Sequence, residues 1–154
     1  MESAPQVERF RPLRALLNGL VAVLLGWIIF LIPAFTIAIS IGFDLGPQGV
    51  EQAEISRVIS NRISELYRGS LLVQLGGTLI VALLVYWRAR VCASGAGAHA
   101  VRTGLVVAVV PVIGDLISTA MTGAGIVAFL MPLGYVAAGY FGGAAKRARV
   151  TPGA

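Results

Sequence analysis

A single carboxylate, that of Asp115, stands inside an otherwise apolar segment that covers residues 103–121. A charged side chain at the centre of a bilayer costs about 2.5–3.5 kcal/mol, and acidic residues found there commonly relay protons or ions. Pro111 has no backbone N–H, so it leaves a carbonyl of the preceding turn without its helical donor. Ser118 and Thr119 follow about one turn after the carboxylate. Together these residues predict a polar notch in an apolar helix, suited to binding a proton or a cation.

No basic residue lies inside any apolar segment of the sequence, so Asp115 has no ion-pair partner there. Gln74 lies near the outer end of its own apolar segment, at a depth similar to that of Asp115, and its amide is a candidate hydrogen-bond donor. The alternative is that Asp115 is protonated, or reaches the outer interface because its helix tilts. Further candidate donors are Asn18, Thr36, Tyr135 and Tyr140.

Catalytic and metal-binding motifs are missing from the sequence. The chain has one cysteine, Cys92, and one histidine, His99, which excludes both a disulfide and a zinc site built on Cys and His. The Ser94-Gly-Ala-Gly stretch lacks the partner acid and base of a nucleophile elbow, and no lysine follows its glycines as in a phosphate loop. We therefore expect no catalytic residue, no metal and no cofactor, in a protein that is not an enzyme.

Arg57, Asn61 and Glu65 recur at intervals of four and share one face of a predicted helix. This cluster resembles the Arg…Asn…Glu cluster that leads into the second helix of the four-span membrane glutathione transferases. The resemblance covers one short segment, and no second motif of that family occurs. The distribution of charge also places the cluster outside the cytoplasm, where glutathione is scarce. A membrane-embedded enzyme is therefore kept as a third alternative, and the chain is not assigned to the family.

The composition predicts the elements that must position these residues. Of the 154 residues, 57% are hydrophobic and 12% are charged, against about 25% charged residues in soluble proteins. Lipid cannot satisfy free backbone groups, so continuous apolar runs cross it as helices, each of about 20 residues. We expect an all-α integral membrane protein built as a four-transmembrane-helix bundle. Its predicted spans cover residues 15–41, 71–87, 103–121 and 125–143.

Basic residues predict the orientation, because loops rich in Lys and Arg remain cytoplasmic. Residues 1–14 form a cytoplasmic N-terminal segment, residues 15–143 the transmembrane domain and residues 144–154 a basic cytoplasmic tail. The net charge of +5 then reflects threading and attraction to anionic lipid rather than nucleic-acid binding. A small chain rich in Ala, Gly and Arg indicates a bacterial inner (plasma) membrane. The basic residues expected inside are Arg9, Arg11, Arg14, Arg88, Arg90, Arg102, Lys146, Arg147 and Arg149.

The outer loop, residues 42–70, carries Ile55, Ile59, Ile63 and Leu66 at helical spacing, with charged residues between them. This pattern predicts an amphipathic helix. We expect it to lie on the membrane interface or over the mouth of the bundle. Its role is either to bind a partner or gate the bundle, or simply to cover the loop.

Glycines and prolines predict how the spans pack and bend. Pro33, Pro111 and Pro132 each stand inside a predicted span, where we expect kinks. Small residues let membrane helices approach closely, and Gly139 with Gly143 forms a GxxxG pair. Such faces pack either inside the bundle or between protomers. The expected packing residues are Gly76, Gly77, Gly134, Ala138, Gly139, Gly142 and Gly143.

Two classes of function follow. The first is a small non-enzymatic membrane protein, an accessory or scaffolding subunit that forms a homo-oligomer or docks on a partner membrane protein through its Gly/Ala-rich faces. The second is a small channel or transporter component that handles protons or cations at Asp115. The expected partners are the lipid bilayer and either copies of the chain or another membrane protein. Nucleic acid is excluded, because basic and aromatic residues are not interleaved.

Overall fold

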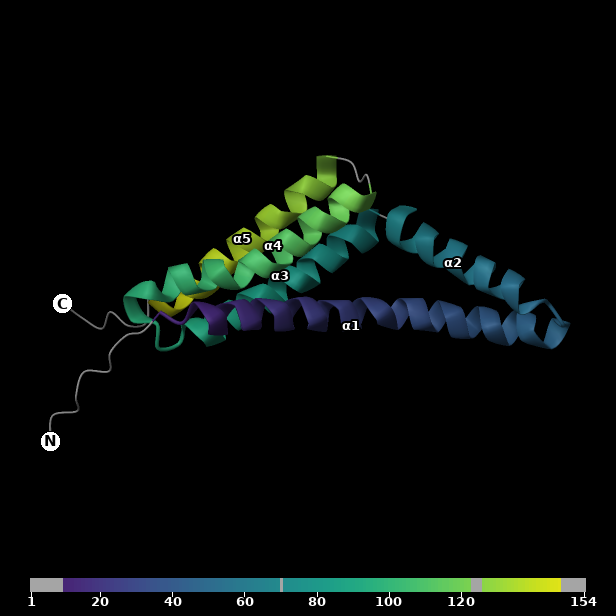
Figure 1. Ribbon diagram of the computed structural model, residues 1–154, viewed down its shortest axis with the longest axis horizontal. Helices are drawn as coiled ribbons and strands as arrows, with labels where there is room; N and C mark the ends of the chain where they lie inside the picture. The colour runs from purple at the N-terminus through teal and green to yellow at the C-terminus, as the bar shows by residue number, and fades with distance from the viewer. Residues whose placement is uncertain (1–9, 70, 123–125, 148–154) are drawn as a thin grey trace, which may run out of the picture. The chain divides into compact units, whose positions relative to one another are not determined.

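α-Helices make up nearly all of the structure, a computed structural model that describes residues 10–69, 71–122 and 126–147. These ranges contain five α-helices and no strand (Figure 1). Two short 3₁₀ turns, η1 (Gly46–Gln48) and η2 (Gly97–His99), follow α1 and precede α4. The all-helical prediction is confirmed for the described residues. The helices are α1 (Pro12–Leu45), α2 (Gln52–Gly69), α3 (Leu71–Ala93), α4 (Ala100–Thr122) and α5 (Ile126–Arg147).

Three segments of the described chain are long and apolar enough to cross a membrane, and they overlap the first three predicted spans. Their helices are longer than predicted: α1 alone has 34 residues, or about 51 Å at 1.5 Å per residue, against a hydrocarbon core of about 30 Å. The chain is therefore compatible with association with a membrane. The three segments are Pro12–Gln48, Leu71–Ala93 and Gly97–Ala120.

The number of spanning segments within the described residues is one fewer than the four predicted. The fourth prediction, residues 125–143, falls on α5, except for Gly125, which lies outside the described residues. The predicted hairpin connection at 122–124 lies outside them too, apart from Thr122, as does the tail from residue 148.

Large apolar side chains cover the surface of the spanning helices. Leu72 is 82% exposed, Trp27 67% and Phe35 62%. Soluble proteins rarely expose contiguous apolar patches of such extent, because water penalises them. Lipid is the solvent that these surfaces fit.

The helices assemble into two compact units, and α1 and α3 contribute to both. Unit 1 comprises Met1–Leu25 and Thr78–Ala154. Its described part holds the first half of α1, most of α3, and all of α4 and α5. Unit 2 comprises Gly26–Gly77 and holds the second half of α1, α2 and the first turns of α3. Both boundaries lie inside a helix and beside a glycine.

Small side chains form the core of unit 1. Within the described residues, Val85 and Val107 are the largest side chains that are fully buried. Lipid supplies no hydrophobic force between helices, so their association depends on small residues that let the backbones approach. The core cluster consists of Ala15, Ala22, Val85, Ala89, Val107 and Ala108.

In unit 1, α4 and α5 lie side by side and meet at glycines (Figure 1). A Cβ atom placed on Gly139 would lie 2.5 Å from the carbonyl oxygen of Gly104. A Cβ atom on Gly143 would lie 2.5 Å from the carbonyl oxygen of Ala100. No side chain fits into these gaps, so the predicted GxxxG pair brings two backbones of the same chain into contact.

Gly19 on α1 meets the carbonyl that Pro111 leaves without a helical donor. Pro111 stands four residues after Val107 and has no N–H to offer to the Val107 oxygen. A Cβ atom on Gly19, which is buried, would overlap that oxygen. The α1 backbone therefore closes on the free carbonyl, where a glycine Cα–H supplies a weak donor.

Each of the three proline-containing helices continues through its proline. Pro111 and Pro132 are buried, whereas Pro33 is exposed. Because α1, α4 and α5 each remain one helix across these positions, the kinks expected there stay a prediction.

In unit 2, α2 packs its apolar face inward. Its larger apolar side chains, including Ile59 and Ile63, are half-buried, whereas the charged side chains from Glu54 to Glu65 are exposed. The Tyr67 hydroxyl donates a hydrogen bond to the Phe30 carbonyl of α1, and the rings of these two residues lie 5.6 Å apart. The amphipathic helix predicted in the outer loop is thus present as α2, and its place at a membrane interface stays a prediction.

The adjacent glycines Gly76 and Gly77 on α3 give a matched test of packing in unit 2. A Cβ atom on Gly77 would overlap the Phe30 ring, whereas one on Gly76 meets nothing within 4 Å. We expect Gly77→Ala to lower the free energy of unfolding by about 1–2 kcal/mol, since the ring must shift, and Gly76→Ala to cause no loss. Unfolding by sodium dodecyl sulfate in mixed micelles, followed by circular dichroism, measures both. Equal stability of the two variants would contradict this packing.

Candidate functional site

Asp115 lies on the packed face of α4. This face carries a series of buried residues spaced by multiples of four, and Asp115 falls into the same series. Asp115 itself is half-buried, whereas its neighbours Gly114 and Leu116 are exposed. The carboxylate therefore points toward the helices of unit 1 rather than away from them. The buried members of the series are Thr103, Val107, Pro111 and Thr119.

Two polar side chains from other helices of unit 1 are connected to this carboxylate, Tyr135 directly and Thr78 through Tyr135. Tyr135 of α5 is 5% exposed and lies close enough to Asp115 to interact with it electrostatically. The side chains of Tyr135 and Thr78 of α3 are hydrogen-bonded to each other. We name Thr78, Asp115 and Tyr135 the Asp115 cluster.

One oxygen of the cluster is buried and unpartnered. Asp115 Oδ2 has almost no accessible surface and accepts no hydrogen bond from any of the described residues. A buried polar atom without a partner costs about 1–3 kcal/mol, and more when it is charged. A fold that keeps such an atom has an acceptor ready for a proton or a cation.

The residues predicted beside Asp115 are placed differently from one another. Thr119 is buried on the same face of α4, and Ser118 is exposed. Gln74 belongs to unit 2, where its amide Nε2 donates to the Tyr67 carbonyl oxygen at 3.3 Å. Its pairing with Asp115 stays a prediction.

Of the four further candidate donors, Tyr135 is the one that the structure brings to Asp115. Asn18 donates to the Arg14 carbonyl oxygen at 2.7 Å. Thr36 donates to the Ile32 carbonyl oxygen at 2.9 Å, so both serve the backbone of their own helix. Tyr140 is exposed.

Thr78 was not predicted from the sequence. It lies within an apolar helix, and a threonine in such a helix usually satisfies its hydroxyl on the carbonyl of the preceding turn. Its one helpful signal is its spacing of four from Gln74, which places both on one face of α3. Only the approach of α5 shows that this face carries part of a site.

The Asp115 cluster supplies a carboxylate and two hydroxyl groups, all of them oxygen atoms. Oxygen ligands suit protons and hard cations rather than soft metals. No group of three or more His, Cys, Asp or Glu residues gathers anywhere in the described ranges. Chemically, the cluster can take up a proton on Asp115, or hold a small cation against the carboxylate.

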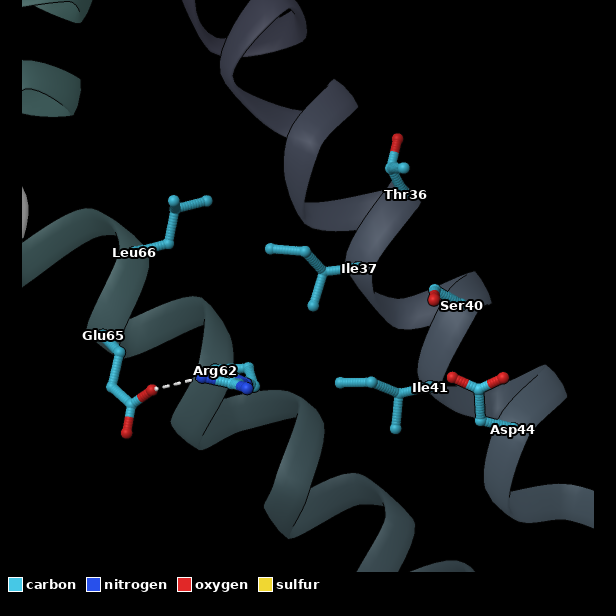
Figure 2. A pocket seen from close by; sticks show the side chains of 8 residues that line it. All are labelled: Thr36, Ile37, Ser40, Ile41, Asp44, Arg62, Glu65 and Leu66. Atoms are coloured by element: carbon cyan, nitrogen blue, oxygen red, sulfur yellow. Dashed lines mark hydrogen bonds and ion pairs between the residues drawn. The ribbon is translucent and has the colours of Figure 1, made fainter.

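An open groove of about 850 Å³ lies in unit 2, between α1 and α2 (Figure 2). Its α1 wall presents Thr36, Ser40 and Asp44 at intervals of four, beside the apolar Ile37 and Ile41. Its α2 wall presents Leu66 and an ion pair between Arg62 Nη1 and Glu65 Oε2, 3.3 Å apart. Both members of that pair are largely exposed, so it contributes little to stability.

The face of α2 that resembles the glutathione transferase cluster is exposed. Arg57, Asn61 and Glu65 are all exposed. Of the three, Glu65 lines the groove and pairs with Arg62 instead. Arg57 and Asn61 do not line this groove, so the three residues are not brought together there.

Most of the predicted packing residues contact another helix, whereas Gly76 has open space around it. Ala138 packs against the core of unit 1. Gly142 faces α3, and a Cβ atom on it would lie 2.6 Å from the Tyr86 carbonyl oxygen. Gly134 is adjacent to the cluster, with 3.9 Å between such an atom and Thr78 Cγ2. Gly139 and Gly143 contact α4. Most glycines of α5 therefore pack against other helices of the same chain.

Comparisons of the chain with protein families, with curated proteins and with solved structures give no match. The candidate function therefore depends on the geometry of the chain itself.

Proposed function

We propose that the chain is a small, non-enzymatic integral membrane protein that handles protons or cations at Asp115, as a component of a channel or transporter. The observation that carries this proposal is the buried Asp115 Oδ2, which no described residue satisfies. A carboxylate of purely structural use would be expected to bond the hydroxyls beside it. Instead, the nearby Tyr135 hydroxyl is bonded to Thr78.

Polar groups at other levels of the packed face of α4 support a path for the ion. Thr103 is 3% exposed, and its Oγ1 is also buried without a partner among the described residues. It lies twelve positions before Asp115, or about 18 Å along the helix axis. Thr119 continues the face beyond the carboxylate. Polar groups at several depths of one buried helix face are typical of ion and proton pathways.

The proposal includes four crossings, with α5 as the fourth and with both termini in the cytoplasm of a bacterial inner membrane. Its support is the gathering of basic residues at one end of the helices of unit 1. Arg14 begins α1, Arg88 and Arg90 end α3, Arg102 begins α4 and Lys146 ends α5. In an antiparallel arrangement of four crossings these positions fall on one side, and Lys and Arg are retained inside.

The test is the flux of protons and monovalent cations through proteoliposomes that contain the purified full chain. Asp115→Asn removes the charge and keeps the shape, so we expect this variant to lose most of the flux while it reconstitutes normally. Asp44→Asn is the matched control, because Asp44 is exposed in unit 2, and its flux should equal that of the unsubstituted chain. Unchanged flux in Asp115→Asn would eliminate the proposal.

The second candidate is an accessory or scaffolding subunit, and one observation favours it. Gly76 on α3 and Gly114 on α4 have open space around them, since a Cβ atom on either meets nothing within 4 Å. Open glycines on apolar helices leave room for a close-packed helix of a second copy or of a partner membrane protein. A scaffold would keep its assembly in Asp115→Asn, and a channel component would lose its flux.

A further inference from the structure

Basic side chains from three helices converge at one end of unit 1. Arg14 of α1 and Arg88 of α3 both lie close enough to Cys92 to act on its thiol electrostatically. The Arg102 guanidinium of α4 lies over the Phe10 ring, 4.5 Å from its centre. We name Arg14, Arg88 and Arg102 the basic end of unit 1.

No acidic side chain among the described residues of unit 1 lies at this end. Within the described residues of unit 1, Asp115 is the one acidic residue. It lies thirteen positions along α4 from Arg102, or about 20 Å away along the axis. The described residues therefore give this end a positive charge that an anion would balance.

The geometry of Arg88 indicates which kind of anion. Its Nε is buried and has no hydrogen-bond partner among the described residues. Its guanidinium also lies 5.4 Å from the centre of the Trp87 ring, and Trp87 is 50% exposed. Tryptophan on a membrane helix favours the headgroup level of the bilayer, so Arg88, the next residue, lies near the depth of lipid phosphates.

The aromatic residues beside the basic end suit a lipid rather than a soluble anion. Phe10 lies between Arg102 and His99, with its ring centre 6.2 Å from that of His99. Phe10 and Trp87 offer apolar contacts to glycerol and acyl carbons next to the phosphate. The planar fork of arginine binds phosphate oxygens in pairs.

We propose that the basic end of unit 1 binds the phosphate headgroup of an anionic phospholipid, with Arg88 as the principal donor. The proposal does not depend on ion handling at Asp115, and it concerns the opposite part of α4. The bound lipid would fix the depth of α1, α3 and α4 in the bilayer.

Trp87 provides a local readout of this site. The chain has two tryptophans, so in a Trp27→Phe background Trp87 is the sole tryptophan. The full chain in dodecyl maltoside micelles is titrated with phosphatidylglycerol, with phosphatidylcholine and with inorganic phosphate. We expect phosphatidylglycerol alone to change the Trp87 emission in a saturable manner.

Substitution of the basic end should weaken this response. We expect Arg88→Gln to reduce the apparent affinity for phosphatidylglycerol by about fivefold or more, the effect of one basic residue at an anionic surface. Arg14→Gln, at an exposed position, should reduce it too and serves if Arg88→Gln does not fold. Arg57→Gln, exposed on α2 of unit 2, should leave it unchanged. An equal response to phosphatidylcholine or to inorganic phosphate, or full affinity in both basic-end variants, would overturn the proposal.

Discussion

Gly139→Ala is expected to lower the free energy of unfolding by about 3 kcal/mol, the upper range for an overpacked interior. The added methyl group would lie 2.5 Å from the Gly104 carbonyl oxygen and 2.9 Å from the Ala108 Cβ. A flexible side chain could move aside, but a helix backbone cannot move without separating α4 from α5. Titration with sodium dodecyl sulfate in mixed micelles, followed by circular dichroism, measures the change.

Gly114→Ala is the matched control for this loss. It makes the same change in an apolar helix of unit 1, at a position where a Cβ atom meets nothing within 4 Å. We expect it to retain full stability, so the difference between the two variants reports the contact rather than the loss of a glycine. If Gly139→Ala were as stable as Gly114→Ala, α4 and α5 would not meet at this glycine.

Asp115→Leu is expected to raise the free energy of unfolding by about 2–3 kcal/mol. The substitution removes a buried, unpartnered carboxylate oxygen and with it the cost of a carboxylate within the membrane. Leucine is similar in length and suits the half-buried position. Thermal unfolding in dodecyl maltoside micelles, monitored by circular dichroism, gives the change in melting temperature.

The stability of this variant separates the two interpretations of Asp115. If the carboxyl group were a structural element, bonded within the fold, Asp115→Leu would destabilise the protein. If the chain retains it for ion handling, the variant gains stability and loses flux. Asp44→Leu, at an exposed position of unit 2, should change the stability by less than about 0.5 kcal/mol.

The helices and their type were predictable because the signals that define them are local. Apolar runs that lack strand alternation predict helices in lipid, and α1, α3 and α4 follow from them. The period of apolar residues predicted α2 in the same way. The ends were less predictable: α1 continues to Leu45, past Asp44, because one charge at the end of a helix does not interrupt its backbone hydrogen bonds.

The site was predictable in part. Asp115 and Pro111 were identified from their residue types, since a carboxylate and a proline are unusual in an apolar helix. The carbonyl freed by Pro111 was also predicted, but its partner Gly19 was not. Gly19 stands far away in the sequence, and nothing in its local context differs from that of the other glycines.

The sequence by itself determined that this chain forms apolar helices suited to a membrane, one amphipathic helix, and one carboxylate within an apolar helix. Tertiary structure decided that Tyr135, which is hydrogen-bonded to Thr78, lies near Asp115. It also decided that Gly77 packs against the Phe30 ring, whereas Gly76 has open space around it. The physical reason is that apolar side chains occur on every side of α3 and α4, so the few polar ones do not mark a buried face. An amphipathic helix reveals its buried face by its pattern, whereas the rotation of a uniformly apolar helix is set by backbone contacts between residues far apart in the sequence.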